Sequence, residues 1–326
     1  MTDLLKNPIF NDETAAREWL EARVWPEGPV CPHCGATEDD VTKLEGKAHR
    51  PGVYQCSECR EQFTVTVKTV FERSKIPLTK WLAALFLMTA SKKGVSAHQV
   101  HRMLGVSYKS TWFMMHRLRE AMRVGGLSPL GGVVEADETY FGDVPEAKRP
   151  TKSTKGRKFT KGGRSGPSGK RAVIALVQRG GKVRSFHVAV ADGETVAQIV
   201  NENIAHEAHL MTDESRLYTK VGENFALHGT VTHSHGEYVR TDDVLKDGKY
   251  VPTKIHTNTV ENYFSVFKRG MRGTYQHCAE KHLHRYLAEF DFRYNNRSAL
   301  GVEDNARAET LAAGIVGKRL TYRRPH

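Results

Sequence analysis

Two closely spaced pairs of cysteines constrain the fold of this chain more than any other feature. Cys31 and Cys34 lie in CPHCG, Cys56 and Cys59 lie in YQCSEC, and a strand is predicted directly after them at Gln62–Phe71. Each Cys-x-x-Cys fits a tight knuckle, and two knuckles place four thiolates around one tetrahedral Zn²⁺ ion. A redox pair or unconnected thiols are the alternatives. Because so small a ribbon buries little apolar surface by itself, we predict a zinc ribbon with a structural metal ion.

The composition favours a globular protein with a polyanionic partner. Of the 326 residues, 39% are hydrophobic and 26% are charged, and no apolar run reaches the roughly 18 residues of a membrane-spanning helix. The formal net charge is +12, which favours phosphate binding because Lys and Arg release condensed counterions there. With no secretory signal and only Cys278 outside the two pairs, we expect a reducing compartment. The localisation predicted is cytoplasmic, with no membrane partner.

A basic helical region follows the cysteine pairs. Ser96 can cap a short helix that ends at Gly105, and a longer helix is predicted over Tyr108–Arg123. A short helix, a turn containing glycine and a longer basic helix have the order of a helix-turn-helix motif, in which the second helix enters the major groove. Lys109 and Arg117 on that helix are therefore predicted DNA contacts. An ordinary helical hairpin within a core is the alternative.

The region from about 131 to 300 has the pattern of a mixed α/β domain. A glycine-bounded strand, a hairpin, a helix, a short buried strand and two long helices follow one another. They are expected at Gly131–Gly142, Lys170–Val190, Thr195–Ile204, His209–Ser215, Thr257–Gly273 and His282–Arg297. This order is that of an RNase H-like fold, a mixed sheet with helices packed on it. The predicted fold class is α/β, an RNase H-like catalytic core preceded by a zinc ribbon and a helix-turn-helix-like region.

These patterns divide the chain into four segments. We expect an N-terminal helix and zinc ribbon at 1–72, a DNA-binding region at 73–126, the catalytic domain at 127–300 and a basic tail at 301–326. The catalytic domain contains an insertion at 146–171 with ten Lys or Arg, one Glu and five Gly. Such a segment has little to bury, so it is either a solvated insertion or a DNA contact, and we predict the contact. Its predicted DNA-binding residues are Lys155, Arg157, Lys158, Lys161 and Arg164.

Three acidic residues differ from ordinary surface charges. Asp137 lies inside a strand-like run, where Asp is disfavoured, and Asp213 ends the buried strand HLMTD. Glu261 lies on a predicted helix and shares a face with Lys268, next to a stripe of apolar residues. A carboxylate there could reach metal ions bound at the sheet while a lysine holds DNA. Phosphodiester attack is helped by two Mg²⁺ ions about 4 Å apart, and carboxylate oxygens suit that ion. Singly each acid is best explained as a cap or surface charge, but together, in this element order, they predict a two-metal site.

The sequence resembles bacterial insertion-sequence transposases of the DDE superfamily, specifically the zinc-ribbon-bearing group of the IS fifteen-ninety-five type. The resemblance covers the chain from about residue 20 to 300. It is carried by CPHCG with CSEC, ADETYFG, MTDES, HTNTVENYFSVFKRGMRGTYQH and KHLHRYLAEFDFRYNNR.

The resemblance implies an RNase H-like core that cleaves and transfers DNA strands at the inverted repeats of an insertion sequence, with Mg²⁺ as the metal ion and Mn²⁺ as the alternative. By position, Asp137 matches the first acid and Asp213 the second. The third position varies in this group, and Glu261 is preferred over Asn262 because Lys268 follows it by seven residues.

Further expectations concern a DNA contact, the neighbours of the site and the partners. Arg272, on the same helix face as the third acid and the lysine, is a predicted DNA contact. His256 and Asn258 are possible neighbours of the site, and Tyr140 and Tyr275 could stack on DNA if they are not simply buried. The partners implied are terminal inverted repeats and target DNA, bound by at least a dimer, in a bacterial, nucleoid-associated setting. A non-catalytic DNA-binding regulator and an RNase H-fold junction resolvase are the competing hypotheses.

Overall fold

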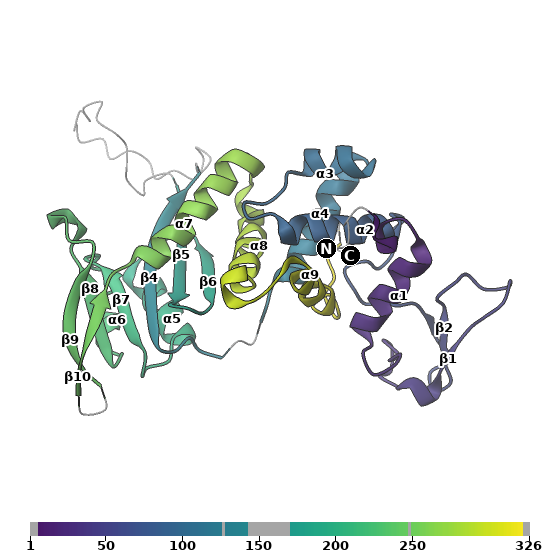
Figure 1. Ribbon diagram of the computed structural model, residues 1–326, viewed down its shortest axis with the longest axis horizontal. Coiled ribbons are helices and arrows are strands. Elements are labelled where there is room, and N and C mark those ends of the chain that lie inside the picture. The colour runs from purple at the N-terminus through teal and green to yellow at the C-terminus, as the bar shows by residue number, and fades with distance from the viewer. Residues whose placement is uncertain (1–5, 126–127, 143–169, 247–248, 322–326) are drawn as a thin grey trace. The chain divides into compact units, whose positions relative to one another are not determined.

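The computed structural model describes residues 6–125, 128–142, 170–246 and 249–321 and divides into two compact units (Figure 1). The first unit combines Met1–Gly125 with Gly273–Tyr275 and Asn296–His326. The second combines Gly126–Arg272 with Gln276–Asn295. The first unit is therefore built from both ends of the chain.

The helical part of the first unit surrounds a single apolar helix. Its helices are α1 (Glu13–Val24), α2 (Leu78–Ala90), α3 (Ala97–Leu104), α4 (Tyr108–Met122) and α9 (Asp304–Ala313). Trp81, Leu82, Leu85 and Met88 of α2 are almost completely buried, as are further residues on its other faces. A helix that is apolar on every side lies at the centre of a bundle, and α2 accordingly packs against α1, α3, α4 and α9.

The helix-turn-helix-like part of this unit has the expected boundaries. The Ser96 side chain accepts a hydrogen bond from the Gln99 backbone and begins α3, and Gly105 ends it with a left-handed φ of 60°. That conformation is unstrained only for glycine. Ser107 then caps α4.

The ribbon is a small antiparallel sheet in the order β1-β2-β3. Its strands are β1 (Val41–Lys43), β2 (Tyr54–Cys56) and β3 (Gln62–Phe63). The strand predicted over Gln62–Phe71 is therefore much too long. The chain leaves the sheet at Phe63 and turns, with Lys68 at a φ of 54°. The alternating valines misled the prediction because Val65 and Val70 are buried from turns rather than from a pleated strand.

The second unit contains a five-stranded mixed sheet in the order β6-β5-β4-β7-β8. The strands are β4 (Val133–Phe141), β5 (Arg171–Gln178), β6 (Val183–Val188), β7 (His209–Asp213) and β8 (Leu227–Val231). β4, β5 and β6 pair antiparallel, whereas β7 pairs parallel with both β4 and β8. This is the RNase H-like arrangement, and it places β4 at the centre of the sheet.

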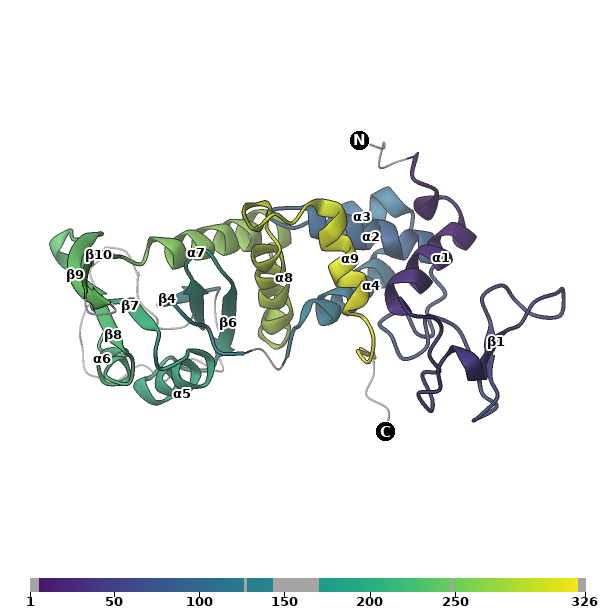
Figure 2. The same ribbon diagram turned by 60° about the horizontal axis from the view of Figure 1, so that its bottom comes forward.

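Helices cover both faces of this sheet (Figure 2). On one face lie α7 (Asn258–Gly270), which packs on β4 and β5, and α8 (Leu283–Asn295), which packs on β6. On the other lie α5 (Gly193–Asn203) and α6 (Thr219–Gly222), whose apolar side chains join those of β4, β5 and β7 in one core cluster. A separate hairpin, β9 (Arg240–Lys246) with β10 (Lys249–Ile255), leads into α7.

Candidate metal centres and active site

The four cysteine sulfurs of the ribbon form a compact cluster. Sγ of Cys31 lies 3.6 Å from Sγ of Cys59, and Sγ of Cys34 lies 3.6 Å from Sγ of Cys56. These distances exceed a disulfide bond and agree with the separation of about 3.8 Å that tetrahedral Zn–S bonds of about 2.3 Å require. Burial opposes ionisation of Cys31, but backbone N–H groups of Cys34 and His33 donate to it and lower the pKa of its thiol to about 7. The donor set therefore fits a structural zinc ion.

Asp137 lies on β4, on the sheet face covered by α7. Side chains alternate along a strand, and Val134 and Ala136 of β4 point into the core cluster beneath α5. The opposite face therefore carries Glu135, Asp137 and Phe141. There the ring of Phe141 packs against the ring of Phe267 of α7, with 5.6 Å between the ring centroids. An acidic residue in this strand is thus directed at the helix that carries Glu261.

Asp213 is level with Asp137 on the neighbouring strand. The parallel register of β4 and β7 pairs Val133 with His209 and Glu135 with Met211. The same offset, continued by two residues, places Asp213 beside Asp137 on the same face. Its Oδ1 accepts the Ser215 backbone N–H at 3.0 Å, so the carboxylate also fixes the turn that follows β7.

Glu261 projects from the first turn of α7. Its Oε1 accepts a hydrogen bond from Thr257 Oγ1 at 3.1 Å and lies 3.5 Å from Nε2 of His233. Asn262, the alternative for the third position, is exposed, whereas Glu261 is half-buried. The helical phase expected from the sequence agrees with the structure, because Val260, Phe264 and Phe267 are buried beside it.

Electrostatic coupling joins the acids. Burial, together with the charges of Glu138, Asp213 and Glu261, raises the pKa of Asp137 well above its usual value. Burial lowers the pKa of Lys268, while the Asp137 carboxylate acts in the opposite sense. In the part of the chain that the structure describes, only the ribbon cysteines bring three or more potential ligand atoms within 4.8 Å of one another, so the three acids are spread more widely.

Two acidic residues flanking Asp137 belong to the same region and were not predicted from the sequence. Glu135 is completely buried and accepts hydrogen bonds from the start of α7. Glu138 points to the other face, where burial and the charge of Asp213 raise its pKa and Tyr218 lies close. The signal available was EADE itself, with three acids in four strand positions, of which only Asp137 was considered from the sequence.

The predicted DNA contacts have different fates. Lys109 and Arg272 are exposed. Arg117 is only 7% exposed; its Nη2 donates to the Glu72 carbonyl at 2.6 Å, and its guanidinium lies over Trp81. The prediction of Arg117 as a DNA contact is therefore wrong, because the residue faces the core of its own unit. The five residues predicted in the basic insertion lie outside the described residues, and they are Lys155, Arg157, Lys158, Lys161 and Arg164.

The remaining candidates flank the site or pack within the protein. Nδ1 of His256 lies 3.1 Å from Glu135 Oε1, and Asn258 is exposed at the first position of α7. Tyr140 is half-buried. Tyr275 lies beneath the guanidinium of Arg119, 5.2 Å from it, which is a packing role rather than an exposed stacking surface.

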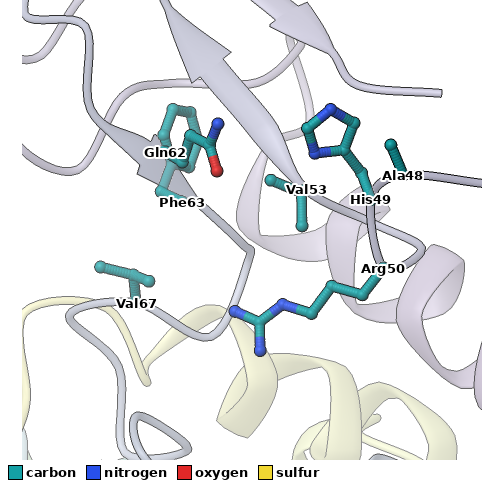
Figure 3. A pocket seen from close by; sticks show the side chains of 7 residues that line it. All are labelled: Ala48, His49, Arg50, Val53, Gln62, Phe63 and Val67. Carbon is teal, nitrogen blue, oxygen red and sulfur yellow. The ribbon is translucent and has the colours of Figure 1, made fainter.

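A small hollow lies beside the ribbon (Figure 3). His49 and Arg50 border it together with Gln62 and apolar side chains of the ribbon. None of the residues predicted as catalytic or metal-binding lines it. Because its lining lacks a cluster of acids or thiols, it offers no metal site.

Two family models match the chain. An "ISXO2-like transposase domain" matches residues 129–295, just over half of the chain, and a "Transposase zinc-ribbon domain" matches residues 11–62. A curated relative, "Uncharacterized protein in transposable element ISH50" from Halobacterium salinarum, is 28% identical over 286 residues, which are 87% of this chain and 91% of the relative. The zinc-ribbon match ends shortly after the second cysteine pair, and the transposase-domain match begins shortly before β4, the strand that carries Asp137.

A solved structure matches the chain at low sequence identity. "Crystal structure of the Mos1 Strand Transfer Complex" is 11% identical, covering 68% of this chain and 77% of that one at a TM-score of 0.19, which does not establish a shared fold. Among the described helices, none is long and apolar enough to cross a membrane.

Proposed function

The chain belongs to the ISXO2-like transposase family, and we propose that it cleaves DNA at the terminal inverted repeats of an insertion sequence and joins the freed ends to target DNA. The observation that carries this proposal is the convergence of Asp137, Asp213 and Glu261 on one face of the central sheet. Asp137 and Asp213 come from the neighbouring strands β4 and β7, and Glu261 comes from α7, the helix that packs on β4.

The donor set fits hard divalent cations. Each of the three side chains offers carboxylate oxygens, the ligands that Mg²⁺ and Mn²⁺ prefer. Burial and then the neighbouring carboxylates raise the pKa of Asp137, and a bound cation would relieve the repulsion between these carboxylates. Two such ions would polarise the scissile phosphate and activate the attacking oxygen. A pair of ions does not require all three acids in one coordination shell, which agrees with their wider spacing.

The basic residues near the acids supply the charge that a DNA substrate needs. Lys268 lies on the same face of α7 as Glu261. Its ammonium group interacts electrostatically with Asp137 and Arg272. We assign it to a phosphate next to the scissile bond, and Arg272 to the backbone further along. Lys109 and the basic insertion are proposed to hold the terminal repeat. Because two element ends must be joined to one target, we propose at least a dimer on DNA.

Strand transfer by the purified zinc-loaded protein tests this function. The assay uses a labelled terminal-repeat duplex, target DNA and Mg²⁺. We expect joined products that disappear in Asp137→Ala, Asp213→Ala and Glu261→Ala, and that persist in Asn262→Ala, which serves as the matched control.

The outcomes separate the competing hypotheses. Joining that persists in Asp137→Ala or Asp213→Ala would refute the site. Cleavage of branched DNA without joining would indicate a junction resolvase. Specific binding to the repeat without cleavage by the wild-type chain would indicate a regulator. Loss of joining in Asn262→Ala but not in Glu261→Ala would exchange the third residue.

A further inference from the structure

Glu135 is a buried carboxylate that caps a helix from a distant strand. It is 0% exposed on β4. Its Oε2 accepts the backbone N–H groups of Thr259 at 2.7 Å and Val260 at 3.0 Å, and its Oε1 accepts Thr259 Oγ1 at 2.8 Å. The first N–H groups of a helix have no partner within the helix and carry partial positive charge. No side chain at the N-cap, Thr257, satisfies them, so Glu135 takes that role from across the domain.

Arg179 neutralises this carboxylate and extends its hold on the chain. Its Nε donates to Glu135 Oε1 at 2.6 Å. Its Nη1 donates to the Lys254 carbonyl at 2.6 Å and its Nη2 to the His256 carbonyl at 2.8 Å. The planar guanidinium thus ties the end of β10 and the connection to α7 to the sheet, a fork that a lysine could not reproduce.

These contacts stand between two of the proposed catalytic acids. Glu135 is two residues before Asp137 on the same face of β4, and Val260 is followed directly by Glu261. Asp137 and Glu261 are therefore connected through a short path of hydrogen bonds and covalent bonds with few free rotations. Displacements of about 1 Å in a catalytic group can reduce rates about a hundredfold. The distance between Asp137 and Glu261, which this path fixes, therefore affects the rate of reaction.

We propose that Glu135 and Arg179 form a positioning pair that sets the location of Glu261 relative to Asp137 and thereby the affinity of the site for its divalent ions; this inference rests on the proposed function. Neither residue touches the metal ions. Outer-shell partners of metal ligands commonly change metal affinity about 10–100-fold when they are replaced.

Glu135→Gln is the informative variant. Its amide oxygen can still accept the Thr259 and Val260 N–H groups, but its NH₂ group then faces the Nε–H of Arg179. Two donors in contact repel each other, so the guanidinium should release the carbonyls of Lys254 and His256. The start of α7 is then less well fixed while the helix keeps its cap.

The chain offers a matched control in Glu289→Gln. Glu289 is also completely buried and also paired with an arginine, Arg293, but both lie on α8. Loss of that pair should lower stability by a similar amount without touching the connection to α7.

The experiment measures Mn²⁺ binding to zinc-loaded full-length protein by electron paramagnetic resonance of free Mn²⁺, with thermal unfolding of each variant alongside. Asp137→Ala serves as the background, because Mn²⁺ that still binds to this variant binds elsewhere on the chain. We expect Glu135→Gln to weaken Mn²⁺ binding about tenfold or more, Glu289→Gln to bind like the wild type, and both to lose stability. Single-turnover joining at saturating DNA should slow in Glu135→Gln, with its affinity for terminal-repeat DNA unchanged.

Unchanged Mn²⁺ affinity in Glu135→Gln would overturn the proposal, as would equal weakening in Glu289→Gln, because the effect would then be general destabilisation. A wild-type chain that binds no Mn²⁺ through Asp137 would overturn it as well. If the wild type joins no DNA but Glu135→Gln still weakens Mn²⁺ binding selectively, the proposed function fails and the positioning pair stands.

Discussion

Asp137 illustrates a conflict between stability and activity at a single residue. Burial and neighbouring carboxylates raise its pKa well above the ordinary 3.8, so the folded protein holds this proton more tightly than the unfolded chain. When the pKa of an acid is higher in the folded state than in the unfolded state, the protein loses stability as the pH rises from the unfolded-state pKa through the folded-state pKa. Without Mg²⁺, ionisation of Asp137 therefore destabilises the fold.

We predict that Asp137→Asn abolishes strand transfer and stabilises the Mg²⁺-free protein by about 1–2 kcal/mol. The amide oxygen can still accept the Glu138 backbone N–H that Asp137 Oδ1 accepts at 2.8 Å. Urea denaturation at neutral pH in zinc-containing buffer measures the change. Asp243→Asn, on the exposed side of β9, is the control for a general effect of removing a negative charge. An Asp137→Asn protein no more stable than this control would contradict the prediction.

Lys109 and Arg117 share a helix but have opposite surroundings, and their substitutions should separate binding from folding. Lys109 is exposed on α4, whereas burial lowers the pKa of Arg117 and its guanidinium is bonded to the Glu72 carbonyl. We predict that Lys109→Ala lowers affinity for terminal-repeat DNA and reduces the salt slope of log K by about 0.9, at unchanged thermal stability.

Arg117→Ala should instead destabilise the first unit by roughly 1–3 kcal/mol, because the part-buried Glu72 carbonyl loses its hydrogen-bond donor. Its DNA affinity, measured well below the unfolding temperature, should keep the salt slope of the wild type. A reduced slope in Arg117→Ala would return this residue to the DNA surface.

At the scale of elements, the sequence predicted those helices and strands whose pattern is local, within their own residues. The strand around Asp137 and the helix carrying Glu261 were correctly placed, because glycines bound β4 and a 3.6-residue period runs along α7. β8, β9 and β10 were not predicted. β8 is short and β9 is rich in charged residues, so pairing partners rather than local pattern decide that they are strands.

The candidate site shows the same division. Asp137 and Asp213 each end up on the expected strand, but their alignment depends on the register between β4 and β7, which no local pattern specifies. The role of Glu135 was missed for the same reason, since its partners Thr259 and Val260 are 124 and 125 residues away. Likewise, the burial of Arg117 depends on Glu72 and Trp81, which belong to other segments.

The junction of β6, α7 and α8 contains a buried acid whose proton should control stability. Asp291 of α8 accepts hydrogen bonds from Ser185 Oγ at 2.8 Å, the Ser185 backbone at 2.9 Å and Tyr263 OH at 2.5 Å. Burial raises its pKa from 3.8 to about 7, although these hydrogen bonds oppose the rise. The folded state therefore holds the proton more tightly between these two pH values, and stability falls as pH rises through this window.

We predict that Asp291→Asn removes this dependence. Its amide can donate to the hydroxyl oxygens of Ser185 and Tyr263 while its oxygen accepts the Ser185 N–H. The stability of Asp291→Asn relative to the wild type should rise between about pH 4 and pH 7 by up to about 4 kcal/mol and then stay constant. Urea denaturation of both proteins across this range gives the difference. Parallel stability profiles would show that Asp291 remains ionised throughout.

At the scale of the whole molecule, the first unit depends on the C-terminal end of the chain. Residues 301–326 were expected to form a basic tail, but α9 lies there, and Leu311 and Ile315 are completely buried. Arg307 donates to the Thr89 carbonyl at 2.9 Å, and Lys318 donates to the Ala121 carbonyl at 2.7 Å. The C-terminal segment thus binds to α2 and α4, although most of the chain lies between this segment and those two helices in sequence.

This arrangement predicts that a substitution in α9 damages the N-terminal helices and spares the catalytic sheet. Leu311→Ala should destabilise the first unit by about 2–5 kcal/mol through the cavity it leaves. Hydrogen exchange followed by mass spectrometry should show faster exchange in α1 and α2, which pack on α9, with unchanged protection in β4, β5 and β7. Asn305→Ala, exposed on the same helix, should change neither. Equal loss of protection in the sheet would mean that the two units unfold together, because local damage to α9 would then propagate through both cores.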